Sequence, residues 1–332
     1  MRFILVFLAG LFAGALIAPA AARTLTVYTY DSFVSKWGPG PELKKRFEAR
    51  CGCTLKFVGL GDGVAVLSRL KLEGAASKAD IALGLDSHIL AEARASGLFA
   101  RHGQDLSRLT VPGGWTDTTF LPFDYGYFAF VYDANRLKNP PTSLWALVDN
   151  RNGPRLIIED PRSSTPGLGL LVWMRQLYGN AAPSAWRTLA PRIVTVTKGW
   201  SEAYGLFLKG EADMVLSYTT SPAYHMIVEK KDHYRAAPFS EGHMMQIELA
   251  AVLKNAPQPQ LARTFLAFLV SGEAQSLIPT TNWMYPVTDI GNALPAEFGR
   301  LVKVEKPLRV DPDKLRLNRR KWLGEWLDAL GR

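Results

Sequence analysis

From Thr24 onward, short runs of β-branched and aromatic residues alternate with segments of helical periodicity, which limits the chain to α/β architectures with largely parallel sheets. The first predicted strands are TLTVYTY, CTLKFVGL and ADIALGL. Between them lie helical patterns at residues 41–50 and in GVAVLSRLKLEG, where Val64, Leu67 and Leu70 recur on one face. Together these segments predict the first part of one lobe.

A second series of the same kind follows and predicts a second lobe. Its strands are LIIED, IVTVTKGW and ADMVLSY, and its helices cover residues 166–178 and SEAYGLFLKG. Two longer apolar segments, residues 121–133 and 243–253, have the length to cross between the lobes. Two lobes joined by extended crossings form a hinge, and ligands of open α/β sheets bind beyond the carboxyl ends of the strands.

The expected domain boundaries follow from these segments. Residues 1–22 form an export signal, residues 23–124 begin lobe 1, residues 125–242 form lobe 2 and residues 243–284 return to lobe 1. Within the return, residues 257 to 278 predict two helices. Residues 285–332 form a C-terminal segment that the sequence does not assign to either lobe. Its last helix carries a stripe at helical spacing, made of Leu315, Arg319, Trp322, Trp326 and Leu330. We interpret this stripe as packing, because an amphipathic helix on a globular body buries one face.

The first twenty-two residues have the organisation of a cleaved export signal. Arg2 precedes an apolar run that ends in small residues, so the mature chain begins near Arg23. Cleavage after Ala20 and an uncleaved anchor are the alternatives. No later segment reaches the roughly 20 uncharged apolar residues of a membrane helix, so we expect an exported, soluble protein.

The net charge of +9 is spread along the chain instead of forming one basic block. Part of the excess lies in residues 303–321, where Glu305, Asp311 and Asp313 stand among the basic residues. The sequence contains no nucleic-acid-binding motif, and we therefore expect no nucleic-acid partner.

The chain has two cysteines, Cys51 and Cys53, in the segment RCGCTL. An exported compartment permits them to pair, although a bridge across one intervening residue closes a very small ring. Two thiols without a second pair or nearby histidines make a poor zinc site. We expect a structural or incidental role for both, with their oxidation state left open.

Residues suited to ligand binding follow the predicted strands of the first lobe. Tyr30 comes directly after the first strand, and Asp62 and Gly63 lie in a loop that opens a helix. Glycine lets a ligand approach the backbone closely, and the free N–H groups of a helix start point outward. The segment GLGDGV resembles a dinucleotide fingerprint, but the GxGxxG pattern is incomplete. We therefore place these three residues at the cleft.

The second lobe twice places hydroxyl groups directly before a helix. Ser164 and Thr165 follow one strand and precede Pro166, an arrangement that suits a phosphate or another anion. Ordinary N-capping is the alternative for this motif. The pattern recurs after another strand with Thr219, Thr220 and Ser221. Its recurrence in one lobe favours a binding site.

Aromatic residues accompany these arrangements. Trp200 lies beside a helix start, Tyr218 ends a strand, Tyr224 follows a few residues into a helix, and Trp283 lies in a loop flanked by prolines. A single large ring usually belongs to a core or an interface, but rings recurring at strand ends predict an aromatic cleft. Flat aromatic walls favour a planar heterocycle, more so a cationic one, whereas the hydroxyl-rich helix starts favour phosphate.

Segments spread over nearly the whole mature chain form a specific set: LTVYTYDSF, WGPGP, DGV, SKADIALGLD, VPGGW, PFDYGYFAFVYD, DPRSSTPGLGLL, TVTKGWSEAYGLFLKGE, LSYTTSPAYH, FSEGH and NWMYPV. With them the chain closely resembles the periplasmic thiamine-binding proteins of ABC-type importers. The resemblance implies a type II, two-lobed α/β solute-binding fold in the periplasm. It also implies that thiamine, thiamine monophosphate or thiamine diphosphate is carried to an inner-membrane ABC permease with its ATPase. We expect a monomer.

The resemblance also implies roles for individual residues. The DG pair that contacts ligand in that family falls on Asp62 and Gly63, and the tryptophan of KGWSE falls on Trp200. The hydroxyl pair before the Pro-Gly turn and the YTTS run fall on Ser164, Thr165, Tyr218, Thr219, Thr220 and Ser221. Further ring contacts are expected from Tyr30, Tyr224 and Trp283. We expect no catalytic residue, no metal ligand and no cofactor.

Two other functions are weighed against this expectation. A thiamine-degrading transferase has a similar fold and a cysteine nucleophile, but Cys51 and Cys53 lie at the entry to a strand without a neighbouring base. A periplasmic iron-binding protein would use Tyr218, Tyr224 and His225, which make a thin ligand set without clustered carboxylates.

Overall fold

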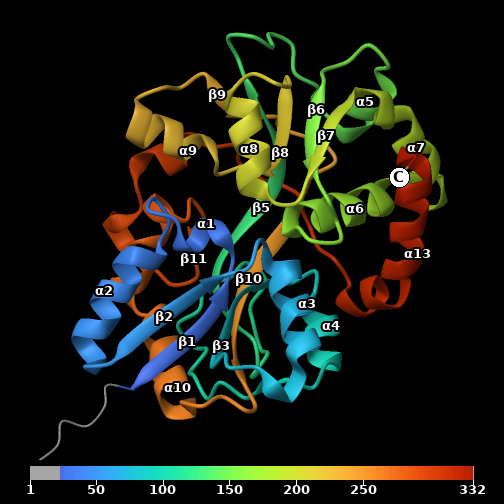
Figure 1. Cartoon of the computed structure of the whole chain (residues 1–332). Helices are drawn as coiled ribbons and strands as arrows, with labels where there is room; N and C mark the ends of the chain where they lie inside the picture. Colours follow the sequence, from blue (N-terminus) through green and yellow to red (C-terminus); the bar gives the residue numbers. More distant parts are fainter. Residues whose placement is uncertain (1–22, 332) are drawn as a thin grey trace, which may run out of the picture.

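The computed structural model describes residues 23–331, which form two lobes joined by two long strands (Figure 1). The expected export signal, residues 1–22, lies outside the described residues. Within the described part of the chain, no helix is long and apolar enough to cross a membrane. The two-lobed α/β fold expected from the alternating segments is confirmed.

The first lobe contains a parallel sheet in which β1 lies between β2 and β3. In chain order, its elements are β1 (Thr24–Thr29), α1 (Asp31–Val34), α2 (Gly40–Cys51), β2 (Thr54–Gly59), α3 (Gly63–Glu73), β3 (Ile81–Asp86), α4 (Leu90–Ala95), β4 (Phe99–Ala100), α10 (Pro259–Leu269), α11 (Gly272–Gln275) and α12 (Ile278–Thr281). Helices α10 and α11 confirm the two helices predicted for residues 257–278, with Ser271 capping the start of the second, and α12 follows from Ile278. Phe33, Phe47, Phe123 and Phe265 are fully buried in this lobe.

The second lobe is also built on parallel strands, with β6 between β7 and β8. Its elements are α5 (Leu144–Asp149), β6 (Leu156–Glu159), α6 (Thr165–Tyr178), α7 (Ala182–Leu189), β7 (Ile193–Thr197), α8 (Trp200–Leu208), β8 (Met214–Tyr218), α9 (Pro222–Tyr224), the π-helical turn η4 (His225–Glu229) and β9 (Tyr234–Ala236). Helix α6 is apolar on nearly all sides, and ten of its residues are buried. This burial fixes the helix in place, with its N-terminus at the cleft between the lobes.

Two long strands connect the lobes, β5 (Leu121–Asp133) and β10 (His243–Leu253). The first part of β5 pairs antiparallel with β10, and its second part pairs antiparallel with β8 of the second lobe. Strand β10 continues the sheet to β3 of the first lobe. All eleven residues of β10 are buried, which explains the largely apolar character of its sequence. Both strands have the bounds expected from the sequence.

The C-terminal helix α13 (Pro312–Leu330) lies along the side of the molecule (Figure 1). It packs against α7 and α6 of the second lobe and against α4 of the first lobe. Leu315, Trp322 and Trp326 of the predicted stripe are buried, so its interpretation as a packing surface is confirmed. Before α13, the short strands β11 (Tyr285–Pro286) and β12 (Pro307–Leu308) pair with β5 and β10.

Cys51 and Cys53 form a disulfide at the junction of α2 and β2, with their Cα atoms 5.1 Å apart. Gly52 between them has a left-handed backbone (φ 57°), which ends α2 and turns the chain sharply into β2. The two cysteines, whose oxidation state the spacing left open, are thus paired in spite of the very small ring that the bridge closes. Neither sulfur lines the cleft between the lobes.

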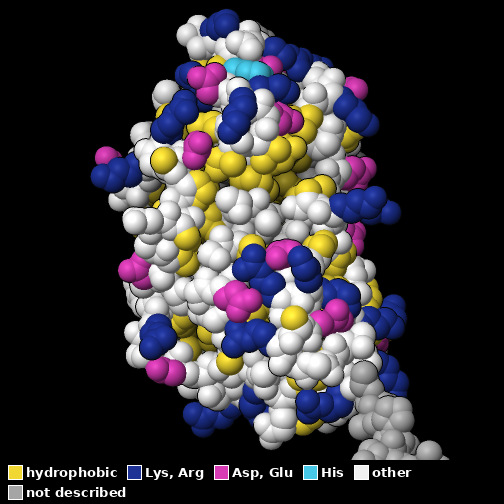
Figure 2. Space-filling view, turned by 90° about the vertical axis from the view of Figure 1, so that its left-hand side faces the viewer, with side chains coloured by type: hydrophobic (Ala, Val, Ile, Leu, Met, Phe, Trp, Pro, Cys, Tyr) yellow, Lys and Arg dark blue, Asp and Glu magenta, His cyan; other side chains and the backbone are white. Residues whose placement is uncertain are grey.

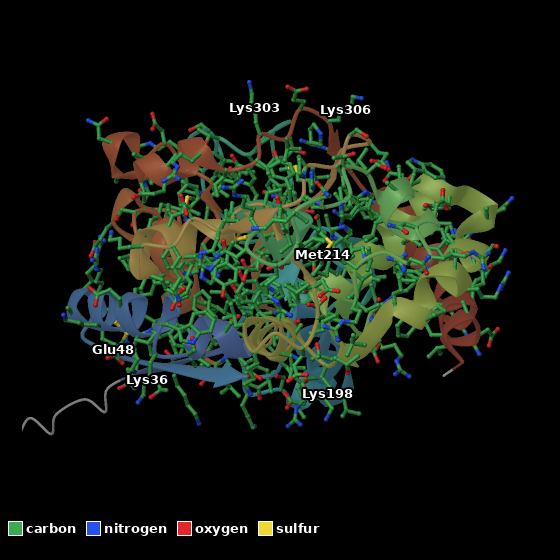
Figure 3. All side chains as sticks on the ribbon, turned by 90° about the horizontal axis from the view of Figure 1, so that it is seen from above. Lys36, Glu48, Lys198, Met214, Lys303 and Lys306 are labelled. Atoms are coloured by element: carbon green, nitrogen blue, oxygen red, sulfur yellow. A yellow bond between two sulfur atoms is a disulfide. The ribbon has the colours of Figure 1, made fainter. Side chains whose placement is uncertain are left out.

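Charged side chains are dispersed over the surface. On the face in Figure 2, basic and acidic side chains are interspersed over both halves of the molecule, without one basic block. Figure 3 shows Lys36 and Lys198 pointing outward on one side and Lys303 and Lys306 on the opposite side, while Met214 lies in the interior. The net charge of +9 thus belongs to a solvated surface.

Candidate ligand-binding site

A cleft of about 330 Å³ lies between the two lobes. Nine of the twelve residues predicted from the sequence line it: Tyr30, Asp62, Gly63, Thr165, Trp200, Tyr218, Ser221, Tyr224 and Trp283. They come from the carboxyl ends of β1 and β8, from the starts of α3, α6 and α8, and from the segment after α12. The structure thus brings together residues up to 253 positions apart in the chain, at the place where strand ends of an open α/β sheet meet.

Three predicted residues lie behind the wall of the cleft: Ser164, Thr219 and Thr220, each fully buried. The hydroxyl of Ser164 accepts from the backbone N–H of Gly167 and so caps α6. Thr220 Oγ1 lies 3.9 Å from the sulfur of Met284. Of the two hydroxyl motifs, Thr165 and Ser221 line the cleft, whereas the side chains of Ser164, Thr219 and Thr220 point into the protein interior.

Several lining residues were not predicted as site residues, notably Trp37, Tyr204, Glu248, Asn282 and Met284. Trp37 and Tyr204 lie within segments that carried the family resemblance, WGPGP and KGWSEAYG. Glu248 is the acidic residue within HMMQIELAAVL, a largely apolar strand. A carboxylate in such a strand is a signal for function, because burying an unpaired charge is costly.

Aromatic rings form the wall contributed by α8. Trp200 stacks on Tyr204 with ring centroids 5.1 Å apart and an interplanar angle of 26°. Its indole Nε1 donates to Ser217 Oγ at 2.7 Å, which fixes the orientation of the ring. Trp37 of the first lobe meets the edge of Trp200 at 6.2 Å and remains about half exposed. The wall is therefore rigid at Trp200 and open to adjustment at Trp37.

A second aromatic pair closes another side of the cleft. Trp283 meets Tyr224 edge to face, with centroids 5.3 Å apart. The backbone of Trp283 has φ 58°, a left-handed conformation that bulky residues rarely adopt. Such a conformation costs about 1–3 kcal/mol and is common at ligand sites. The strained turn holds the indole against the cleft.

Asp62 lies at the start of α3 and is buried, with 9 % of its surface exposed. Its Oδ2 accepts from the backbone N–H of Trp200 in the opposite lobe at 3.2 Å. Burial raises the pKa of this carboxyl to about 6, although hydrogen bonds from Ser164 and Trp200 act in the other direction. Asp62 is therefore a cleft-facing carboxyl whose hydrogen bonds do not fully offset the cost of burying its charge, which suits it to a donor or a cation.

The lobes touch each other directly at the cleft. Besides the contact between Trp200 and Asp62, Thr165 Oγ1 of the second lobe donates to Asp86 Oδ2 of the first lobe at 2.9 Å. Gly63 lies at this contact, where a Cβ would stand 2.0 Å from the carbonyl oxygen of Gly84. The close packing of α3 on β3 within the first lobe thus requires glycine at position 63, beside the hydroxyl of Thr165 from the second lobe.

The charges around the cleft are acidic. Asp62 and Glu248 line it, and within residues 23–331 no lysine, arginine or histidine does so. Glu248 accepts from the hydroxyl of Tyr30 at 2.7 Å. Burial raises the pKa of Glu248 well above its ordinary value, and the nearby Asp124 raises it further. Aromatic walls with uncompensated carboxylates favour a planar ligand that carries a positive charge.

Of the residues weighed for an iron site, Tyr218 and Tyr224 line the cleft, but His225 is engaged elsewhere. Nε2 of His225 lies 2.9 Å from the hydroxyl of Tyr204, and its Nδ1 lies 2.9 Å from Glu229. Both ring nitrogens therefore have partners, and His225 is fully buried outside the cleft. Within the described part of the chain, no group of three or more His, Cys, Asp or Glu residues has an arrangement that could hold a metal ion.

The fold and the cleft define a class, the bacterial extracellular solute-binding proteins, and this family matches residues 38–280. Among curated proteins, the chain is 58% identical over 316 residues to the thiamine-binding periplasmic protein of Escherichia coli (strain K12), covering 95% of this chain and 96% of that protein. It is 53% identical over 334 residues to the thiamine-binding periplasmic protein of Brucella abortus biovar 1 (strain 9-941), covering both fully.

A solved structure of a periplasmic thiamin binding protein has a TM-score of 0.92 and 57% sequence identity, covering 94% of this chain and 97% of that chain. The chain therefore belongs to the family of thiamine-binding periplasmic proteins. The family resemblance drawn from the sequence motifs is thereby confirmed.

Proposed function

We propose that this protein captures thiamine in the periplasm and delivers it to an inner-membrane ABC permease with its ATPase. The observation that carries the proposal is the cleft itself, which combines rigid aromatic walls with acidic side chains and no basic lining residue among residues 23–331. Thiamine has two planar rings, an aminopyrimidine and a positively charged thiazolium, and such a cation is attracted both by aromatic faces and by carboxylates. The relatives named for thiamine binding support the same ligand.

The aromatic side chains hold the ligand in this proposal. Trp200, Tyr218 and Trp283 contact the thiazolium and pyrimidine rings, and Asp62 accepts from the aminopyrimidine or faces the positive ring. A cation stacked on one ring contributes about 0.5–2 kcal/mol, so tight capture needs several rings. Closure of the lobes then presents a defined surface to the permease, where the ligand is released.

Thiamine monophosphate and diphosphate are further proposed ligands. Their phosphate groups would be bound at the start of α6 and at the turn after β8, where Thr165 and Ser221 line the cleft. Because no basic side chain lines the cleft within the described chain, backbone N–H and hydroxyl groups have to supply these contacts. We therefore expect thiamine to bind at least as tightly as its diphosphate.

The protein acts by binding and not by catalysis in this proposal, as a monomer without a cofactor. The transferase alternative needs a cysteine nucleophile at the ligand, whereas Cys51 and Cys53 are bonded to each other outside the cleft. Incubation with thiamine and an added nucleophile should leave the vitamin intact. Transfer of the pyrimidinylmethyl group to the added nucleophile, with release of the neutral thiazole, would instead establish the transferase activity.

Isothermal titration calorimetry tests the proposal. The wild-type protein is titrated with thiamine and with its two phosphates, and then Trp200→Ala is titrated with thiamine. Loss of one stacked ring should weaken thiamine binding roughly 2- to 30-fold. Trp145→Ala is the matched control, because Trp145 is equally a partly exposed tryptophan but packs on Tyr178 away from the cleft. Equal affinities of wild type and Trp200→Ala would contradict the proposed stacking of the ligand on Trp200.

A further inference from the structure

Three carboxylates from neighbouring strands lie side by side at the base of the cleft. In the sheet register, Glu248 of β10 is paired with Asp86 of β3 on one side and with Asp124 of β5 on the other. Asp86 and Asp124 are fully buried, and Glu248 is 8 % exposed and lines the cleft. We call Asp86, Glu248 and Asp124 the carboxylate row.

The hydrogen bonds of the row come from neutral groups. Glu248 accepts from Tyr30 at 2.7 Å and from Gln246 Nε2 at 2.9 Å. Asp124 Oδ2 accepts from Asn282 Nδ2 at 2.6 Å, while its Oδ1 is buried without a partner. Among residues 23–331, no lysine or arginine forms an ion pair with Glu248 or Asp124.

Asp86 is the best satisfied member of the row. Its Oδ1 accepts from the backbone N–H of His88 and lies 3.0 Å from the His88 ring, and its Oδ2 accepts from Thr165. Two carboxylates opposite each other on adjacent strands repel when both are ionised. The repulsion therefore falls on the central pair, Glu248 and Asp124, and Glu248 is the member that reaches the cleft surface.

The geometry points to Glu248, backed by Asp124, as the residue that selects a positively charged ligand over a neutral ligand of the same shape. This inference rests on the proposed function, because it assigns the discrimination to one side chain of that cleft. In the ligand-free protein the negative charge of the row lacks a counter-charge from a side chain. The bound ligand supplies that charge at the cleft surface, where Glu248 is accessible.

Binding of the cation at Glu248 is accompanied by release of a proton from the carboxyl pair Glu248 and Asp124. Burial raises the pKa of Asp124 to about 8 and that of Glu248 well above its ordinary value, so the pair retains a proton near neutral pH. The titratable groups around the pair are Tyr30, Asp62, Asp86 and Tyr218, none of which supplies a positive charge. Arrival of the cation favours the ionised pair, so the carboxylic O–H bond breaks and its proton passes to solvent.

The test compares thiamine with its neutral isostere, in which carbon replaces the positively charged ring nitrogen. Glu248→Gln keeps the size of the side chain and an acceptor for Tyr30, and it removes the charge. We expect the variant to bind thiamine about 10- to 100-fold more weakly, as for loss of a bond to a charged group. Its affinity for the neutral isostere should change less than about threefold.

A second measurement separates charge selection from a structural role. Calorimetric titration of wild type with thiamine, in two buffers of different ionisation enthalpy, should show net proton release near pH 7, and Glu248→Gln should lose most of it. Asp80→Asn is the matched control, because Asp80 is a buried carboxylate of the same lobe that accepts from Thr26 and Gln258 away from the cleft. It should bind thiamine as wild type does.

The outcomes are distinguishable. Equal weakening of both ligands by Glu248→Gln, or proton release unchanged in the variant, would overturn the role of Glu248 while the thiamine site stands. A wild-type protein that binds neither ligand would overturn the proposed function and this inference with it. Selective loss of thiamine affinity together with the lost proton release supports the assignment.

Discussion

Replacing Asp62 with asparagine should change the pH dependence of stability of the ligand-free protein. The carboxyl of Asp62 is buried, and its pKa is raised from an ordinary 3.8 to about 6, mainly by burial. Because the folded state favours the protonated form, wild-type stability is highest where Asp62 is protonated in both states, below about pH 4. The stability that the Asp62 carboxyl contributes is lost as the pH rises from about 4 to about 6.

The magnitude follows from the two pKa values. A rise from 3.8 to about 6 corresponds to about 3 kcal/mol of unfolding free energy. Asparagine does not titrate, so the stability difference between Asp62→Asn and wild type should grow by about 3 kcal/mol between pH 4 and pH 7. The lost hydrogen bonds from Ser164 and Trp200 add an offset that does not depend on pH, so the change across pH isolates the ionisation.

Urea unfolding of the ligand-free proteins at several pH values between 4 and 7 measures this difference. Asp328→Asn serves as the control, because Asp328 is an exposed carboxylate on α13 and should give a nearly constant difference. A difference between Asp62→Asn and wild type that stays constant from pH 4 to pH 7 would refute the raised pKa. It would also remove the argument that burial disfavours the charge of Asp62 until a cation binds.

Three further substitutions probe the surroundings of the cleft. Gly63→Ala should destabilise the protein by about 1–3 kcal/mol, because its Cβ would meet the carbonyl oxygen of Gly84 at 2.0 Å. It should also weaken thiamine binding at least about tenfold. Urea unfolding measures the first effect and calorimetry the second. Ser164→Ala should cost about 1 kcal/mol of unfolding free energy through loss of the cap of α6. Replacing Cys51 and Cys53 together by serine should leave thiamine affinity unchanged and lower the unfolding free energy by less than about 2 kcal/mol, since the bridge closes a very short loop.

The sequence predicted the strands and their ends well because local patterns determine them. Strands β5 and β10 are long apolar runs, and both have the bounds expected from those runs. Tyr30, Trp200 and Tyr218 lie at strand ends or helix starts, and parallel strands bring such positions to one edge of a sheet. The topology therefore follows from periodicity, and most of the cleft wall follows from the topology.

The direction of a side chain in a turn and the register between distant strands do not follow from local patterns. Thr219 and Thr220 look like Ser221 in the sequence, but the turn after β8 buries the first two and exposes the third to the cleft. Glu248 and Asp124 are far apart in the chain and meet because β5 and β10 pair in one particular register. A one-residue slip of either strand would turn its carboxylate to the other face of the sheet and separate the pair.

The placement of the charges links binding to the contact between the lobes. Asp124 and Glu248 lie on the two strands that join the lobes, and Asp62 and Asp86 accept hydrogen bonds from Trp200 and Thr165 across the cleft. We expect any separation of the lobes to break these two bonds and to expose Asp62 and Asp86 to water, so bringing the lobes together again carries the desolvation cost of both carboxylates and opposes closure. A bound cation offsets that cost only when the lobes surround it, so it binds the closed arrangement more tightly. A ligand shifts a conformational equilibrium by its differential affinity for the two states, and here the buried acidic groups provide that difference.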